Sequence, residues 1–102
     1  MIGIDITRVS RFKEFGNLPR FLARFNVDGN DAMAAAKTWA CYEAIIKAEG
    51  SAIDCKKIRI LFPKNQRPEV VDEEKILSGT YALTLSHEGD VVVAVALREN
   101  KY

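Results

Sequence analysis

Apolar and polar residues alternate at the amino-terminal end of the chain, which is the pattern of a β-strand with two different faces. Residues 2–7 place isoleucine at every second position, with Gly3, Asp5 and Thr7 between the isoleucines. Neighbouring side chains on a strand point to opposite faces, so we expect a buried isoleucine face and a polar face that carries Asp5.

A second alternating pattern, near the carboxyl end, predicts a β-hairpin. Its strands are residues 81–87 and 90–98, and Glu88 and Gly89 form the turn between them. The last strand has large apolar side chains on one face and mainly alanine on the other. We therefore expect both faces to be covered, the small one by a helix or by another subunit.

Two shorter apolar runs in the middle of the chain predict two more strands. These are residues 58–62 and 68–71, joined by a turn over residues 63–67. A proline opens the second run, which suits a short edge strand. Residues 8–17 are expected to be a connection, and residues 26–30, which contain Asp28 and Gly29, a loop. Residues 72–79 carry no pattern that assigns them to a helix or strand.

Helical spacing occurs in two segments. Residues 18–25 have apolar positions at helical intervals and predict a short amphipathic helix. Residues 31–49 are rich in alanine and free of glycine and proline, with Asn30 or Asp31 as a cap and Gly50 as the stop signal. This segment is the one long helix that the sequence predicts.

The long helix carries an apolar stripe and an adjoining polar face. Trp39, Tyr42 and Ile46 form the stripe, while Glu43 and Lys47 are four residues apart and therefore neighbours. Polar chemistry could occur on the face of Glu43 and Lys47.

Composition points to one compact domain over residues 1–102. Apolar residues make up 48% of the chain and charged residues 28%, which is ordinary for a globular protein. The length is near the lower end of what buries a self-sufficient core, so association would help. Cys41 and Cys55 have neither a metal-ligand nor a redox spacing; we expect both to be reduced and Cys41 to be buried.

Charge and hydropathy indicate which partners and which cellular compartment to expect. The net charge is only +1, and no aromatic and basic motif is present, which argues against nucleic acid as a partner. No apolar run is long enough to span a bilayer, and Met1 opens into residues 2–6 without the features of a signal peptide. We expect a cytoplasmic protein that does not enter a membrane.

Taken singly, the candidate functional residues have ordinary explanations. An acid such as Asp5 on a strand is usually solvated, and a Glu43–Lys47 pair is common on exposed helices. His87 at the end of a strand is more often a surface residue than a functional one. Only their combination favours a site.

That combination appears in short blocks that follow one another in a recognisable order. The blocks are Gly3-Ile4-Asp5-Ile6, Arg11-Phe12 with Arg20-Phe21-Leu22-Ala23-Arg24, the helical run from Trp39 to Ala48, and Leu83-Thr84-Leu85-Ser86-His87 before the valine-rich strand. Together they resemble the holo-acyl-carrier-protein synthase family of 4'-phosphopantetheinyl transferases. The resemblance implies an α+β fold in which an antiparallel sheet wraps one long central helix, and it implies a homotrimer.

The resemblance also implies a reaction and a set of ligands. A carrier-protein serine attacks coenzyme A, the phosphopantetheine is transferred, and 3',5'-ADP leaves. Asp5 and Glu43 would hold Mg²⁺, whose preferred ligands are carboxylate, phosphate and water oxygens. Glu43, or a water held by the acids, is the candidate base, and Lys47 would offset or protonate the leaving phosphate.

The same resemblance implies two binding surfaces. The expected coenzyme A contacts are Lys47, Gly50, Ser86 and His87, of which Ser86 and His87 would come from a neighbouring subunit. The expected docking residues for an acidic acyl carrier protein are Arg11, Arg20 and Arg24, because clustered arginines speed the encounter with an acidic partner and orient it. At each arginine a solubilising role competes with docking.

Three positions depart from the family pattern. Thr38 stands where an arginine is common, Tyr42 where a lysine precedes the glutamate, and Glu88 where a small hydroxyl residue follows the histidine; Lys37 could compensate. The departures predict weaker coenzyme A binding and support one alternative, a non-enzymatic relative that binds a carrier protein. A metal-dependent hydrolase of another diphosphate is a further alternative.

Overall fold

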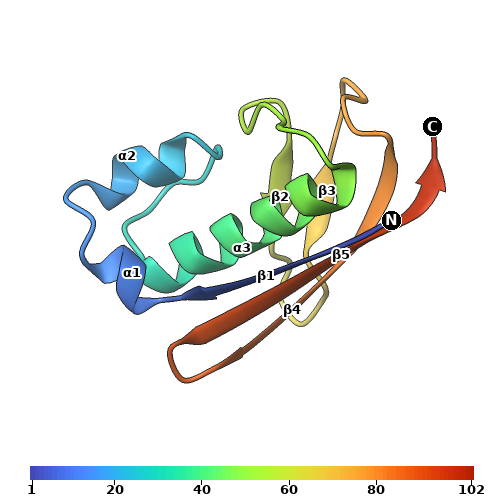
Figure 1. Cartoon of the computed structure of the whole chain (residues 1–102). Helices are drawn as coiled ribbons and strands as arrows, with labels where there is room; N and C mark the ends of the chain where they lie inside the picture. Colours follow the sequence, from blue (N-terminus) through green and yellow to red (C-terminus); the bar gives the residue numbers. More distant parts are fainter.

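A computed structural model describes residues 1–102, the whole sequence. Its elements in chain order are β1 (Ile2–Arg8), α1 (Ser10–Lys13), α2 (Leu18–Ala23), α3 (Ala32–Glu49), β2 (Arg59–Leu61), β3 (Glu69–Val71), β4 (Gly79–Glu88) and β5 (Val91–Lys101). The fold is α+β, with the long helix α3 packed on one face of an antiparallel sheet (Figure 1).

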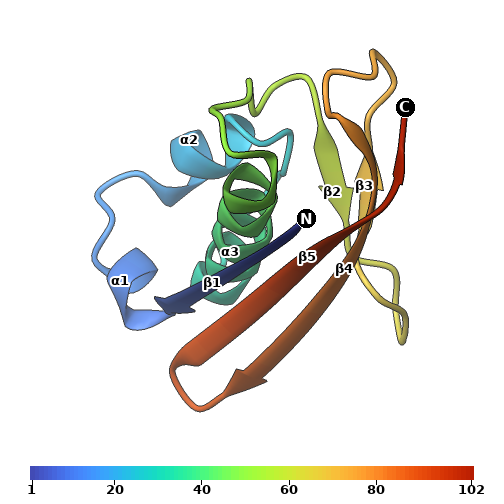
Figure 2. The ribbon, with the colours of Figure 1, turned by 45° about the vertical axis from the view of Figure 1, so that its right-hand side comes forward.

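The main sheet has the order β1-β5-β4, so the carboxy-terminal strand lies in the middle. The small residues Ala94 and Ala96 of β5 face α3 and are fully buried. This confirms the predicted close approach of a helix to that face. Strands β2 and β3 form a separate two-stranded sheet beside β4 (Figure 2).

Most predicted elements are present, with local differences. Helix α3 begins after Asp31, whose side chain accepts a hydrogen bond from the Met33 N–H, and it ends at Gly50, which has a φ of 77°. The carboxy-terminal strand continues to Lys101, beyond its predicted end. A one-turn helix, α1, lies within the stretch expected to be a connection; four residues are too few to show a helical period.

The prediction for the faces of β1 was wrong. Ile2, Ile4 and Ile6 are 60%, 50% and 66% exposed, whereas Gly3, Asp5 and Thr7 are buried against α3. Alternation shows that a strand has two faces but not which face the helix covers. Glycine decides this case, because a Cβ on Gly3 would lie 1.9 Å from the Ala44 carbonyl oxygen. The strand therefore lies against α3 on its small-residue face.

Candidate active site

Asp5 is buried because of its place in β1. It shares a face with Gly3, and Gly3 allows the strand backbone to approach Ala44 and Ala48 of α3 closely. As a result Asp5 is only 9% exposed. An acid in such a place needs partners, since burying an unpaired carboxylate costs considerable free energy.

Lys47 supplies one of those partners. Its Nζ lies 2.9 Å from Asp5 Oδ1 and 3.1 Å from the carbonyl oxygen of Ile4. The lysine side chain is 54% exposed, so this pair lies where a solute could reach it. Glu43 is half-buried one turn earlier on α3, and residues at this spacing are neighbours on a helix surface. The structure thus joins Asp5 to Lys47 and places Glu43 on the adjoining turn.

The donor set at Asp5 fits a divalent cation that arrives with other ligands. Asp5 Oδ2 is buried and has no hydrogen-bond partner, so it is available to a cation. The structure contains no cluster of three or more His, Cys, Asp or Glu side chains that could hold a metal. Mg²⁺ is often bound by only one or two carboxylates together with substrate phosphates and water. Asp5 and Glu43 match that arrangement.

Ser86 and His87 lie on the other edge strand, β4. In the sheet register Ile6, Val93 and Ser86 form one row, and directly paired residues share a face. Ser86 therefore lies on the exposed isoleucine face, opposite to Asp5. His87 lies on the same sheet face as Asp5, but at the far edge of the sheet. Within one chain the structure does not bring Ser86 to Asp5.

His87 lines a basic pocket that the sequence did not predict. The pocket has a volume of about 570 Å³, and its four basic side chains are Lys37, Lys64, Arg67 and His87. Lys64 and Arg67 belong to the turn between β2 and β3, for which the sequence pattern predicts a turn and no binding role. Two cations within a short turn between strands were the available signal. The pocket has the charge to bind phosphate groups.

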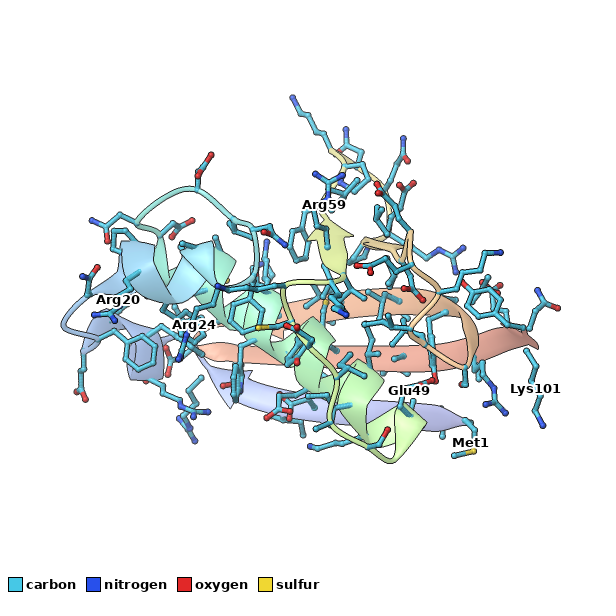
Figure 3. All side chains as sticks on the ribbon, turned by 90° about the horizontal axis from the view of Figure 1, so that it is seen from above. Met1, Arg20, Arg24, Glu49, Arg59 and Lys101 are labelled. Atoms are coloured by element: carbon cyan, nitrogen blue, oxygen red, sulfur yellow. The ribbon has the colours of Figure 1, made fainter.

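The three predicted docking arginines are divided between two helices. The Arg11 guanidinium of α1 stacks 5.3 Å from the centre of the Trp39 ring and 5.6 Å from that of Phe12. Arg20 and Arg24 border a shallow hollow beside Phe15 and Phe21, at the α2 end of the molecule (Figure 3). All three arginines are exposed, so they can meet a partner.

Two of the departures from the family pattern are core residues. Thr38 is fully buried, and its hydroxyl has no hydrogen-bond partner. Tyr42 is also buried, and its hydroxyl donates a hydrogen bond to the Ile53 carbonyl oxygen. Burial, reinforced by Cys55, Asp54 and Glu43, raises the pKa of Tyr42 to about 12. The phenol therefore stays neutral and anchors the loop that follows α3.

Cys41, Gly50 and Glu88 are the other residues that the sequence analysis singled out. Burial raises the pKa of the Cys41 thiol to about 12, against a smaller lowering by Lys37, so Cys41 is an inert core residue as expected. Gly50 ends α3 with its N–H bonded to the Ile46 carbonyl. Its predicted contact with coenzyme A stays a prediction. Glu88 is exposed at the end of β4.

Comparison with known proteins decides the family. No family model matches the chain. A holo-acyl-carrier-protein synthase of Nautilia profundicola is 32% identical over 110 residues, which cover 95% of this chain and 97% of that protein. This chain belongs to the holo-acyl-carrier-protein synthase family.

Two further comparisons agree with this assignment. A holo-acyl-carrier-protein synthase of Mycoplasma mobile is 28% identical over 107 residues, covering 99% of this chain and 91% of that protein. A crystal structure of the Helicobacter pylori holo-acyl-carrier-protein synthase in complex with coenzyme A has a TM-score of 0.79. At 22% identity, over 95% of this chain and 98% of that one, it supports the fold. No helix of this synthase family member is long and apolar enough to cross a membrane.

Proposed function

We propose that this chain transfers the 4'-phosphopantetheine group of coenzyme A to a serine of an acyl carrier protein. The observation that carries the proposal is the ion pair of the buried Asp5 with the exposed Lys47, 2.9 Å apart, within a chain that matches this family over almost its whole length. The unpartnered oxygen of Asp5 adds a place for a cation, with Glu43 one helical turn before Lys47 on α3.

Asp5 and Glu43 would hold Mg²⁺. When bound, the ion neutralises negative charge on the phosphoryl oxygens during transfer. Both ligands are carboxylates, which suit a hard cation. The backbone contact at Gly3 holds Asp5 in place, and the helix holds Glu43, so the two acids lie on rigid elements rather than loops.

The chain's own side chains would move the proton and balance the charge. The serine hydroxyl oxygen forms a bond to the phosphorus that carries pantetheine, and the bond from that phosphorus to the oxygen of 3',5'-ADP breaks. Glu43, or a water that it holds, would take the hydroxyl proton. The Lys47 ammonium would stabilise or protonate the leaving phosphate oxygen, a role that suits a mobile point charge.

The basic pocket would bind the phosphates of coenzyme A. Its two lysines and Arg67 supply positive charge in one hollow, and His87 adds a ring N–H donor. Lys37 lies in it, as the predicted compensation for Thr38 would require. The Helicobacter pylori relative was solved in complex with coenzyme A, which supports the same ligand here. Ser86 and Gly50 complete the proposed contacts.

The exposed sheet face supports association with copies of the same chain. Ile2, Ile4, Ile6 and Leu97 form an apolar surface on β1 and β5, and such a surface on a small protein marks an interface. Ser86 lies on this surface, on the opposite face from Asp5. A neighbouring copy could bring Ser86 and His87 to the Asp5 of the first copy, in the trimer that the family resemblance implies.

Arg11, Arg20 and Arg24 would orient the carrier protein. They are exposed on α1, on α2 and at the C-cap of α2, two helices that both contact α3. Acidic carrier proteins would be attracted to this end of the molecule. Nucleic acid is not proposed as a partner, and we propose that the enzyme works in the cytoplasm, with its carrier.

The direct test is to incubate the chain with Mg²⁺, coenzyme A and purified apo carrier proteins, and to measure the intact mass of each carrier. We expect a gain of about 340 Da, one phosphopantetheine joined to serine through a phosphodiester. Glu43→Gln should abolish the gain while the circular dichroism spectrum stays that of the folded protein.

Other outcomes identify the alternatives. Tight binding of a carrier without any mass gain would favour a non-enzymatic binding protein. Hydrolysis of a nucleotide diphosphate without carrier binding would favour a metal-dependent hydrolase. Omission of the divalent cation, with a chelator present, should stop transfer if Asp5 and Glu43 act through a metal.

A further inference from the structure

The last turn of α3 is fastened to the start of β4 by a single carboxylate. Glu49 Oε2 accepts hydrogen bonds from the hydroxyls of Ser78 and Tyr81, each at 2.5 Å. The Ser78 N–H also donates to Glu49 Oε1 at 3.0 Å. Arg98 of β5 donates to the Ser78 hydroxyl at 2.9 Å. We call these four residues the helix-end network.

The network and the candidate active site hold the same helical turn from different sides. Lys47 and Glu49 are two residues apart, and on an α-helix such residues point about 160° away from each other. Lys47 reaches Asp5 on β1, while Glu49 reaches Ser78, just before β4, and Tyr81 on β4, at the other edge of the sheet. Figure 3 shows Glu49 at the end of the molecule far from Arg20 and Arg24.

We propose that Glu49 is a positioning residue for the transfer reaction, because its bonds to Ser78 and Tyr81 fix the rotation of α3 and thereby the place of the Lys47 ammonium. The inference rests on the proposed function. Glu49 itself faces away from the reacting atoms. A displacement of about 1 Å at a catalytic group can cost up to a hundredfold in rate, so such a fastening matters for catalysis.

The carboxylate form of Glu49 is the form that the network requires. Burial raises its pKa, but the hydrogen bonds from Ser78 and Tyr81 outweigh burial, and the pKa of Glu49 lies below its ordinary value. The charged acceptor is therefore present at neutral pH. Gly50, directly after Glu49, adds no such fastening, because it ends the helix only through its own backbone.

The test compares Glu49→Ala, Glu49→Gln and Tyr81→Phe with the unchanged enzyme, at a temperature where all are folded. We expect Glu49→Ala to lower kcat about tenfold, with KM for coenzyme A and for the carrier within about twofold of their original values. Glu49→Gln keeps one acceptor oxygen and should lose less. Tyr81→Phe removes one bond and remains informative if Glu49→Ala fails to fold.

Asp72→Ala is the matched control. The Asp72 carboxylate accepts two backbone hydrogen bonds at 3.0 Å, from Ile76 and Leu77, in the loop before β4. Its loss should lower the melting temperature and leave kcat unchanged. If Glu49→Ala lowers the melting temperature but keeps the original kcat, the positioning role is refuted.

A double-mutant cycle separates action through Lys47 from an independent effect. In a Lys47→Ala background, Glu49→Ala should cost little further rate, because the group that it positions is gone. Fully additive losses would overturn the proposal. If the unchanged enzyme and Asp72→Ala both give no mass gain on any carrier, the proposed function fails and the positioning role with it. If both react normally, a normal kcat for Glu49→Ala rejects the positioning role alone.

Discussion

Gly3 is the residue that decides where the site lies. Its missing side chain lets β1 contact the backbone of α3, and this contact directs Asp5 and Thr7 toward the helix. The acid becomes buried beside Lys47 rather than solvated. One glycine therefore determines both the packing of the strand and the surroundings of the proposed metal ligand.

Gly3→Ala should destabilise the protein strongly. The new Cβ would lie 1.9 Å from the Ala44 carbonyl oxygen and 2.6 Å from the Ala48 nitrogen, so backbone must move. We expect a loss of about 3 kcal/mol in the free energy of unfolding, measured by urea denaturation. Gly16→Ala is the control, since a Cβ there meets nothing within 4 Å. Equal stability of the two variants would contradict the close contact.

Tyr42 stands where the family pattern has a lysine. Tyr42→Phe tests whether its hydroxyl contributes to the stability of the core or to the binding of coenzyme A. The variant removes the hydrogen bond to the Ile53 carbonyl and should cost about 1 kcal/mol of unfolding free energy. Because the ring is buried, KM for coenzyme A should stay unchanged in steady-state assays. A clear rise in that KM would show instead that the hydroxyl takes part in binding.

At the scale of the elements, the sequence predicted more of the fold than of the contacts. The period of Ile2 to Thr7, the alanine-rich run after Asp31 and the turn at Gly89 each indicated the correct element. These signals are local. The burial of Asp5 depends on how closely two elements approach, and the basic pocket depends on a turn folding over β4, so neither could be deduced from spacing along the chain.

The missed helix α1 illustrates the same limit. Its position depends on a residue 80 places away: Asp90, in the turn between β4 and β5, accepts hydrogen bonds from the Ser10 N–H and hydroxyl at 2.8 and 2.6 Å. The Ser10 hydroxyl is the main cause of the lowered pKa of Asp90. No pattern within residues 8–17 indicates this anchor.

The helix-end network should give stability a defined pH dependence. The pKa of Glu49 is lowered in the folded protein, so its contribution is present above the ordinary carboxyl pKa of about 4 and is lost as the pH falls through the lowered value. The pKa of Tyr81 is raised by burial and by Glu49. Its contribution is present below about pH 10 and is lost as the pH rises through the raised value.

The measurement is the difference in unfolding free energy between the unchanged protein and Glu49→Gln at several pH values. This difference should be largest near neutral pH and shrink toward pH 3. Subtraction cancels the effect of Asp90, which weakens over a similar acid range. A difference that is constant from pH 7 to pH 3 would show that Glu49 is not held as a carboxylate.

At the scale of the whole molecule, the proposed site is incomplete in one chain. Asp5 and Ser86 lie on opposite faces of the sheet, and His87 lies on β4, two strands away from β1. Strands are about 4.8 Å apart, so the two edges are about 10 Å from each other. In the proposed trimer, a site shared between two chains would remove this separation.

Co-expression of two inactive variants tests the shared site. Asp5→Asn removes the proposed metal ligand, and His87→Ala removes the proposed phosphate contact. In the proposed trimers, an active site would need Asp5 from a His87→Ala chain and His87 from a neighbouring Asp5→Asn chain. With equal expression each condition is met in about half of the cases, so about a quarter of full activity should return. Complete inactivity of the mixture would place both residues in the same chain.

The isoleucine row on β1 has a consequence for the synthesis of the protein. β1 is an edge strand with exposed apolar side chains. Such an edge is a template for non-native pairing with strands of other chains. If the proposed trimer forms, a newly synthesised chain exposes this apolar edge until it associates with other copies. Rapid overproduction would therefore favour aggregation. Ile4→Asp should reduce that aggregation and weaken the proposed trimer.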